Sequence, residues 1–157
     1  MAAYEMNFFK EEYQQKVIAH AKAFARCLKD CGLDVAGDPD VSYTETHQVI
    51  LNVGYSKGAE HARSLEENNI LVNYQASPEE EGFTASGSLR MGVSEMTRFG
   101  MEEVDFGELA ELMRDVIVNR AGVKEKVAAF RGRFLEMKYC FSNDQFGERL
   151  SKLHQLI

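Results

Sequence analysis

The stretch Ser86-Gly87-Ser88-Leu89-Arg90-Met91-Gly92 places one arginine in a short apolar run that has glycine on both sides. Because side chains alternate between the two faces of a strand, Leu89 and Met91 are predicted to point into a core while Arg90 points away from it. A guanidinium on a rigid strand is a two-pronged receptor for a carboxylate or a phosphate. The alternative interpretation is an ordinary solvated or salt-bridged surface arginine.

The chain before this stretch alternates between helical and strand patterns. One apolar stripe at three- and four-residue spacing comprises Tyr13, Val17, Ala21, Phe24 and Leu28, and Gly32 follows its last turn. The predicted elements are a helix from Phe8 to about Asp30, short strands over residues 33–36 and 70–72, a turn over residues 37–40, a central strand over residues 47–53, and a helix capped by Ser56 that runs to Glu67.

The chain after residue 72 is predicted to be a loop up to Ser88, and residues 89–91 form the fourth strand. Asp105 and Glu108 predict a capping box for a helix over Phe106–Arg120, which Gly122 ends. A further helix is predicted to bury one face, comprising Val123, Val127, Phe130, Phe134 and Met137. Ser142 and Gln145 repeat the capping pattern before a last short helix to Leu156.

This order of elements predicts one α+β domain over residues 1–157, with helices packed on one face of a small, mostly antiparallel sheet. The formal net charge of -7 argues against nucleic-acid binding, which needs a basic surface. No apolar run approaches the roughly 20 residues of a membrane-spanning helix. The absence of a visible secretory signal and the odd number of cysteines, three, predict reduced thiols in the cytoplasm.

Other candidate side chains have simpler interpretations. His47 begins a strand and is expected to be a hydrogen-bonded structural histidine rather than a catalytic one. Cys27 and Cys31 lie one helical turn apart, but no further ligands with metal-site spacing accompany them, so no metal is predicted. Arg98 could add positive charge near Arg90, although an ion pair with Glu95 or Glu102 is the expected arrangement.

Four segments of the chain match, in the same order, the motifs of one enzyme family. Leu89-Arg90-Met91-Gly92, followed by Thr97, Gly100 and Glu103, resembles the signature Ser-Gly-Ile-Arg-Ile-Gly-Thr-Pro-Ala…Thr…Arg-Gly. Tyr13-Gln14-Gln15-Lys16-Val17 with Ala21-Lys22-Ala23 is similar to Tyr-Gln-x-Gln-Val…Asn-Ala-Lys-Ala. Thr44-Glu45-Thr46-His47 is similar to Thr-Asp/Glu-Asn-His, and Val72-Asn73-Tyr74-Gln75 is similar to Val-Asn-Lys-Asn. Order and spacing hold from about Phe8 to Val118. The family that these motifs resemble is serine hydroxymethyltransferase, a fold-type-I enzyme dependent on pyridoxal phosphate (PLP).

The resemblance implies that residues 8–120 form the C-terminal small domain of such an enzyme, followed by a helical tail over residues 121–157. It implies that Arg90 binds the α-carboxylate of a serine or glycine substrate, and that Gln75 and Asn73 lie near folate. The intact enzyme would be a PLP-dependent homodimer that transfers the serine hydroxymethyl carbon to tetrahydrofolate. The large domain, with the lysine of Thr-Thr-Thr-His-Lys that forms the imine, has no counterpart in this sequence, so the chain alone is expected to be inactive.

The sequence also departs from the family pattern. Val93-Ser94 replaces Thr-Pro, Ser42-Tyr43 replaces Gly-Gly, and Tyr74 replaces a lysine. These changes leave the carboxylate receptor intact but weaken the expectation of folate. Alternatives are therefore a non-catalytic α+β module that binds a small molecule or a protein, and the small domain of another aminotransferase-like enzyme. The enzyme hypothesis predicts a wide exposed apolar patch for the large domain and a second subunit, whereas the module hypothesis predicts none.

Overall fold

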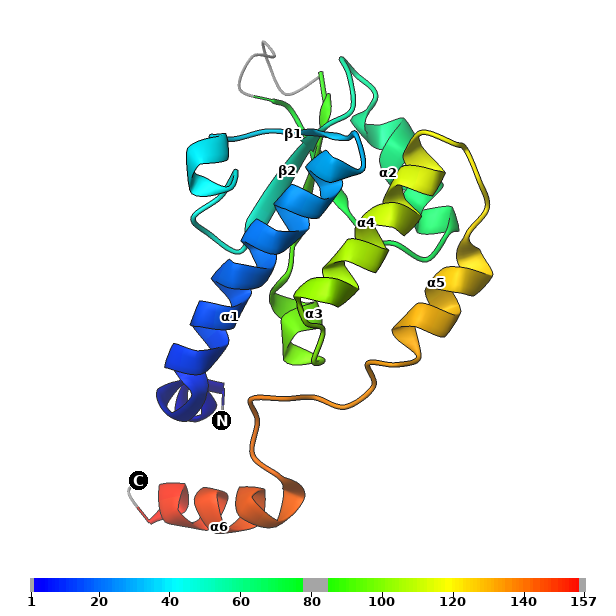
Figure 1. The fold of residues 1–157 in the computed structure, drawn as a ribbon. Coiled ribbons are helices and arrows are strands. Elements are labelled where there is room, and N and C mark those ends of the chain that lie inside the picture. The colour runs from blue at the N-terminus through cyan, green and yellow to red at the C-terminus, as the bar shows by residue number, and fades with distance from the viewer. Residues whose placement is uncertain (1, 78–84, 156–157) are drawn as a thin grey trace.

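The computed structural model describes residues 2–77 and 85–155, and these residues form one four-stranded sheet and six α-helices (Figure 1). The elements in chain order are α1 (Ala2–Asp30), β1 (Asp34–Val35), the 3-10 helix η1 (Pro39–Val41), β2 (Gln48–Asn52), α2 (Gly58–Glu67), β3 (Asn73–Gln75), β4 (Ser88–Gly92), α3 (Ser94–Arg98), α4 (Glu103–Ile117), α5 (Lys124–Arg131) and α6 (Asn143–His154). The predicted α+β class is confirmed. The first helix begins at Ala2, earlier than predicted, and the predicted end of the last helix at Leu156 lies outside the described residues.

The sheet has the order β1-β2-β4-β3, and each neighbouring pair is antiparallel. β2 and β4 therefore form its centre, as predicted for β2. Their register places Leu51 opposite Leu89 and Val49 opposite Met91, and all four side chains are buried. Arg90, between Leu89 and Met91, is exposed on the other face. The alternation predicted for this strand is confirmed.

The helices pack on one face of the sheet, where α1 and α4 cross in front of the strands in Figure 1 and α2 lies beside α4. The residues of this layer with the most completely buried side chains include Val17, Leu28, Leu65, Met101, Phe106 and Met113. On the other face, Gln48, Ile50 and Asn52 of β2 remain half-buried. The sheet is thus covered on one face and open on the other within the described part of the chain.

The third strand lies three residues later than predicted because residues 69 and 70 close α2. Asn69 has a φ of 63°, its N–H donates to the carbonyl of Glu66, and the N–H of Ile70 donates to the carbonyl of Leu65, both at 2.9 Å. These bonds form a Schellman motif, in which an apolar residue after the helix packs against its last turn. Ile70 is buried for that reason. The predicted strand over residues 70–72 is wrong, and the predicted loop over residues 73–88 contains β3.

α2 begins at Gly58, so the prediction that Ser56 caps this helix is wrong. Ser56 has a φ of 57°, and the N-cap, Lys57, makes no side-chain capping bond. The N–H of Gly58 instead donates to the carbonyl of Ser86 at 2.6 Å. A Cβ atom at residue 58 would lie 2.5 Å from that oxygen, so glycine permits the approach of the helix to the segment before β4.

α4 begins and ends three residues earlier than predicted. Its N-cap is Glu102, and Asp105 occupies the third helical position, where its carboxylate accepts from the N–H of Glu102 at 2.9 Å. The capping box is therefore real but comprises Glu102 and Asp105, not Asp105 and Glu108. The helix ends at Ile117, before Gly122, and the preceding short helix α3 is not predicted from the sequence.

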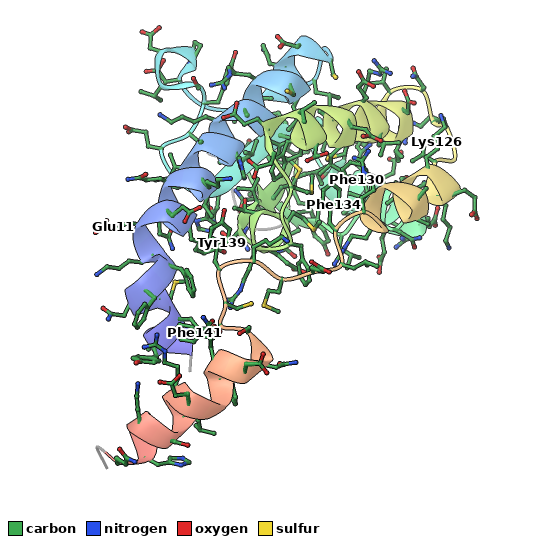
Figure 2. The ribbon with its side chains drawn as sticks, turned by 60° about the horizontal axis from the view of Figure 1, so that its bottom comes forward. Glu11, Lys126, Phe130, Phe134, Tyr139 and Phe141 are labelled. Atoms are coloured by element: carbon green, nitrogen blue, oxygen red, sulfur yellow. The ribbon has the colours of Figure 1, made fainter. Side chains whose placement is uncertain are left out.

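The last part of the chain runs from α5 back to the start of α1 (Figure 2). α5 ends at Arg131, so the predicted helical face through Met137 is too long, although Phe130 and Phe134 are both buried. Beyond it, the N–H of Lys138 donates to the carbonyl of Arg98 at 2.6 Å, and the Tyr139 ring lies 5.3 Å from that of Tyr13.

An aromatic cluster attaches α6 to the first turns of α1. The ring of Phe141 lies 5.3 to 5.6 Å from the rings of Phe8, Phe9 and Tyr4, and the guanidinium of Arg149 lies 4.7 Å above the ring of Phe8. Figure 2 shows Tyr139 and Phe141 beside α1. The predicted cap of α6 is confirmed, because Ser142 and Gln145 exchange side-chain bonds with each other's backbone N–H.

A buried histidine joins α1, α3 and α4. His20 is 2% exposed; its Nδ1 lies 2.9 Å from Thr97 Oγ1, and its Nε2 lies 3.4 Å from a carboxylate oxygen of Glu102. A neutral imidazole satisfies both contacts by accepting from Thr97 and donating to Glu102. Burial lowers the pKa of His20, with the opposite effect of Glu102 being smaller. Burial also lowers the pKa of His61.

Acidification is expected to destabilise the fold through these two histidines. Their pKa values are lower in the folded than in the unfolded chain, so the unfolded chain binds more protons as the pH falls below about 6.5. The contribution of the neutral histidines to the free energy of unfolding is fully present above that pH. Below it, the free energy of unfolding falls by at most about 1.4 kcal/mol per pH unit for each histidine. Urea unfolding at pH 7.5 and 5.5 measures the loss. His20→Asn should reduce the loss of unfolding free energy between these pH values, whereas substitution of the exposed His154, His154→Asn, should not. An equal loss in the unmodified protein and both variants would contradict the assignment of the pH effect to His20.

Candidate functional site

Arg90 occupies the middle of the open face of the sheet. Its register partner on β2 is Ile50 and its partner on β3 is Asn73. Directly paired residues in an antiparallel sheet share a face, with Cβ atoms about 4.5–5.5 Å apart. Arg90 therefore has a half-buried aliphatic side chain on one side and an exposed carboxamide on the other.

The guanidinium of Arg90 makes no hydrogen bond and no ion pair with any residue among 2–77 and 85–155. Arg98, Arg114, Arg120 and Arg133 are each paired with a carboxylate, whereas Arg63 of α2, like Arg90, makes no hydrogen bond or ion pair with the described residues. An exposed arginine on a rigid strand with its five donors free can receive an anionic ligand without first breaking an internal ion pair.

Two hollows on the helix-covered side of the sheet include Arg90 and Asn73 among their lining residues. One, of about 410 Å³, is lined mainly by apolar side chains of β4, α3, α4 and α5, and the other, of about 710 Å³, lies between α2 and β3. Their other charged side chains are balanced in sign: Glu95 and Arg131 in the first, Arg63 and Glu66 in the second. The surroundings are therefore not generally positive, and attraction for an anion depends on Arg90 itself.

A polar row that the sequence analysis missed lies beside Arg90 on the same face. Asp34, Asn52, Ser88 and Gln75 are aligned across the four strands. Ser88 Oγ donates to Asn52 Oδ1 at 2.9 Å, and Asn52 Nδ2 donates to Asp34 at 3.2 Å. The alternation of Gln48, Ile50 and Asn52 with Val49 and Leu51 is the signal that could have identified the open face.

The three candidate residues predicted from the sequence share this face. Asn73 is directly opposite Arg90, and Gln75 is directly opposite Ser88, so Gln75 is a diagonal neighbour of Arg90 at about 7–8 Å. Arg90, Asn73 and Gln75 are therefore neighbours on one face of the sheet, but no contact in the structure identifies the ligand that they bind. Their binding roles stay predictions.

The remaining candidates have structural surroundings. His47 is exposed rather than buried, and its side chain makes no hydrogen bond with the described residues, so the prediction of a hydrogen-bonded structural histidine is wrong. Its ring lies near Gly92, where a Cβ atom would be 3.5 Å from His47 Cδ2. Arg98 forms an ion pair as expected, but with Glu5 at 2.8 Å rather than with Glu95 or Glu102, because α1 extends further than predicted.

The cysteines have no features of a metal site. Burial raises the pKa of both the Cys27 and the Cys31 thiol, which disfavours the thiolate that a metal requires. The part of the chain that the structure describes contains no group of three or more histidine, cysteine or acidic residues that could hold a metal ion. Nor does it contain a helix long and apolar enough to cross a bilayer.

Comparison with known proteins assigns the chain to a family. The family model for serine hydroxymethyltransferase matches residues 2–113. The serine hydroxymethyltransferase of Staphylothermus marinus is 40% identical over 159 residues, covering 98% of this chain and 36% of that protein, and that of Sulfolobus acidocaldarius is 38% identical over 163 residues, covering 100% and 37%. The chain thus spans little more than a third of the length of these relatives.

A solved structure is similar along nearly the whole chain. The crystal structure of L-threonine transaldolase from Pseudomonas fluorescens in its internal aldimine state superposes with a TM-score of 0.83 at 31% identity, covering 97% of this chain and 35% of that one. Sequence and structure agree along nearly the whole chain, including the tail beyond the part that the family model matches. The chain belongs to the serine hydroxymethyltransferase family.

Proposed function

We propose that this chain is the small domain of a PLP-dependent serine/glycine hydroxymethyltransferase, and that Arg90 binds the α-carboxylate of the amino-acid substrate. In the intact enzyme, L-serine and tetrahydrofolate would be converted to glycine and 5,10-methylenetetrahydrofolate. Family membership supports the reaction class. The single observation that supports the role of Arg90 is its exposed guanidinium, which has no partner among the described residues.

A carboxylate is the ligand that suits Arg90 best. Its two oxygens match two parallel N–H donors of a guanidinium, which fixes the plane of the ligand as well as its position. For a small amino acid this orientation decides which bond at Cα faces the reacting group. Ile50 is the register partner of Arg90 on β2, so the arginine extends from a paired strand in the centre of the sheet.

The lysines of this chain do not fit the attachment of PLP. An imine-forming lysine must lose its proton, but the hydrogen bond from Lys16 to Glu102 raises the pKa of Lys16. Every other lysine except the half-buried Lys22 is exposed. We therefore assign the cofactor, which would supply the electron sink, to a large domain outside this chain, and expect the chain alone to be inactive.

The chain covers only 36–37% of the length of its serine hydroxymethyltransferase relatives, and this supports two further partners, a large domain and a second subunit. A large domain of the same protein and a second subunit would complete the site, in a cytoplasmic homodimer. Leu71 and Tyr74, at the outer edge of the sheet, are 81% and 55% exposed. Apolar side chains at that edge are consistent with contact to another part of an intact enzyme.

The similarity to L-threonine transaldolase supports a second candidate, an enzyme that acts as a transaldolase on L-threonine. The substitution of Tyr74 and Gln75 for the Lys-Asn of the family motif favours this alternative, because these positions are implied to lie near folate. Arg90 would have the same carboxylate-binding role in both enzymes. A non-catalytic binding module is the remaining alternative.

The test is turnover by the intact protein that contains this chain, supplied with PLP. Glycine formation from L-serine should require tetrahydrofolate. Folate-independent exchange of L-threonine with an added aldehyde would favour the transaldolase alternative. Failure to bind PLP, together with no turnover of either amino acid, would contradict the enzyme hypothesis and leave the binding module.

A further inference from the structure

We propose that Asn73 is a second carboxylate-binding residue, which donates from its side-chain amide to the carboxylate that Arg90 holds. This inference rests on the proposed function of Arg90. It differs from the role that the family resemblance implies for this residue, which is proximity to folate.

The pairing of β3 with β4 places the two side chains together. Asn73 is the register partner of Arg90, and both residues are exposed on the open face of the sheet. β3 is short, and the pairing begins at Asn73, because residues 69 and 70 are used to close α2. The register is thus set by the end of a helix, and a shift of one residue would move Asn73 to the other face.

Asn73 is the polar neighbour of Arg90 that remains available. Its side chain makes no hydrogen bond with the described residues, whereas Ser88 Oγ and Asn52 are already bonded to each other. Ile50, on the opposite side of Arg90, offers no polar atom. Gln75 is also unbonded but is one row further along the strand, at the diagonal distance of about 7–8 Å.

The chemistry of a carboxamide suits this position. A carboxylate that accepts two bonds from a guanidinium still has unused lone pairs, and an amide N–H₂ can donate to one of them. The neutral amide adds this bond without pairing with Arg90 itself. An aspartate at residue 73 would instead neutralise the guanidinium and repel the ligand.

The experiment measures glycine binding to the intact holoenzyme by calorimetry, and the KM for tetrahydrofolate, in three variants. Asn73→Leu, of similar size but without the amide, should weaken glycine binding about tenfold, because it removes one hydrogen bond to a charged group. Asn73→Asp should weaken it about a hundredfold. Gln48→Leu, the matched control on the same open face in the neighbouring strand β2, should leave glycine binding unchanged, and Asn73→Leu should leave the KM for tetrahydrofolate unchanged.

Unchanged glycine binding in Asn73→Leu would overturn the inference, and a raised KM for tetrahydrofolate in the same variant would assign Asn73 to folate instead. Arg90→Ala separates this failure from failure of the proposed function. If Arg90→Ala weakens glycine binding and Asn73→Leu does not, only the role of Asn73 is wrong; if neither does, the carboxylate site itself is wrong. Asn73→Ser, judged by the same criteria, replaces Asn73→Leu if the latter does not fold.

Discussion

Replacing Arg90 with alanine in the intact enzyme is expected to lower kcat/KM for L-serine by about 10²- to 10³-fold while PLP remains bound. Truncating one partner of a hydrogen-bonded charge pair costs about 2–5 kcal/mol, and each 1.36 kcal/mol of transition-state stabilisation is a factor of ten in rate. The guanidinium of Arg90 makes no bond with the described residues, so the substitution removes no internal interaction of the fold. Steady-state kinetics with L-serine, together with the absorbance of bound PLP, measures both parts of the prediction.

Arg90→Lys is the matched variant, because it keeps the positive charge and removes the planar pair of donors. We expect it to recover little of the lost kcat/KM, since the proposed role depends on orientation as well as charge. Full activity in Arg90→Lys would show that charge alone is sufficient. Unchanged kcat/KM in Arg90→Ala would contradict the assignment of Arg90 to the substrate.

Replacing Phe106 with alanine is expected to destabilise the chain by about 3–5 kcal/mol, the usual cost of a large aromatic deletion in a core. Phe106 is 1% exposed, and its ring lies 5.3 Å from that of His20 and 5.5 Å from that of Phe24. It therefore joins α4 to α1 at the centre of the helical layer. Urea unfolding of the chain followed by circular dichroism measures the loss.

Val104→Ala is the control for this change, because Val104 belongs to the first turn of the same helix and is 80% exposed. It should change stability by less than about 0.5 kcal/mol. Similar losses in both variants would show that α4 is sensitive to any change in its first turn, and the assignment of Phe106 to the core would be wrong.

Local patterns predict the centre of the sheet and the face that Arg90 occupies. In β4, side chains alternate between the two faces of the sheet, so the placement of Leu89 and Met91 in the core fixes Arg90 on the opposite face. The same reasoning fails for β3, because Ile70 has a different role: its N–H donates to the carbonyl of Leu65 and closes α2, and its side chain is buried. The sequence 70–72 contains both a helix-closing motif and a plausible strand, and only the tertiary structure distinguishes them.

The remainder of the site depends on contacts between residues far apart in sequence. The row from Asp34 to Gln75 requires the register of all four strands, which no local pattern contains. The tail is a similar case: Phe141 and Arg149 pack against Tyr4 and Phe8, more than 130 residues away in the chain. The apolar stripe predicts α1 and the capping pattern predicts α6, but the contacts between these helices follow from the folded topology.

The most direct test of the central claim is a crystal structure of the intact holoenzyme with bound glycine. We predict that both carboxylate oxygens of glycine accept hydrogen bonds from the guanidinium of Arg90, at about 2.7–2.9 Å, on the open face of the sheet. A glycine carboxylate held by a different residue, with Arg90 facing solvent, would contradict this assignment.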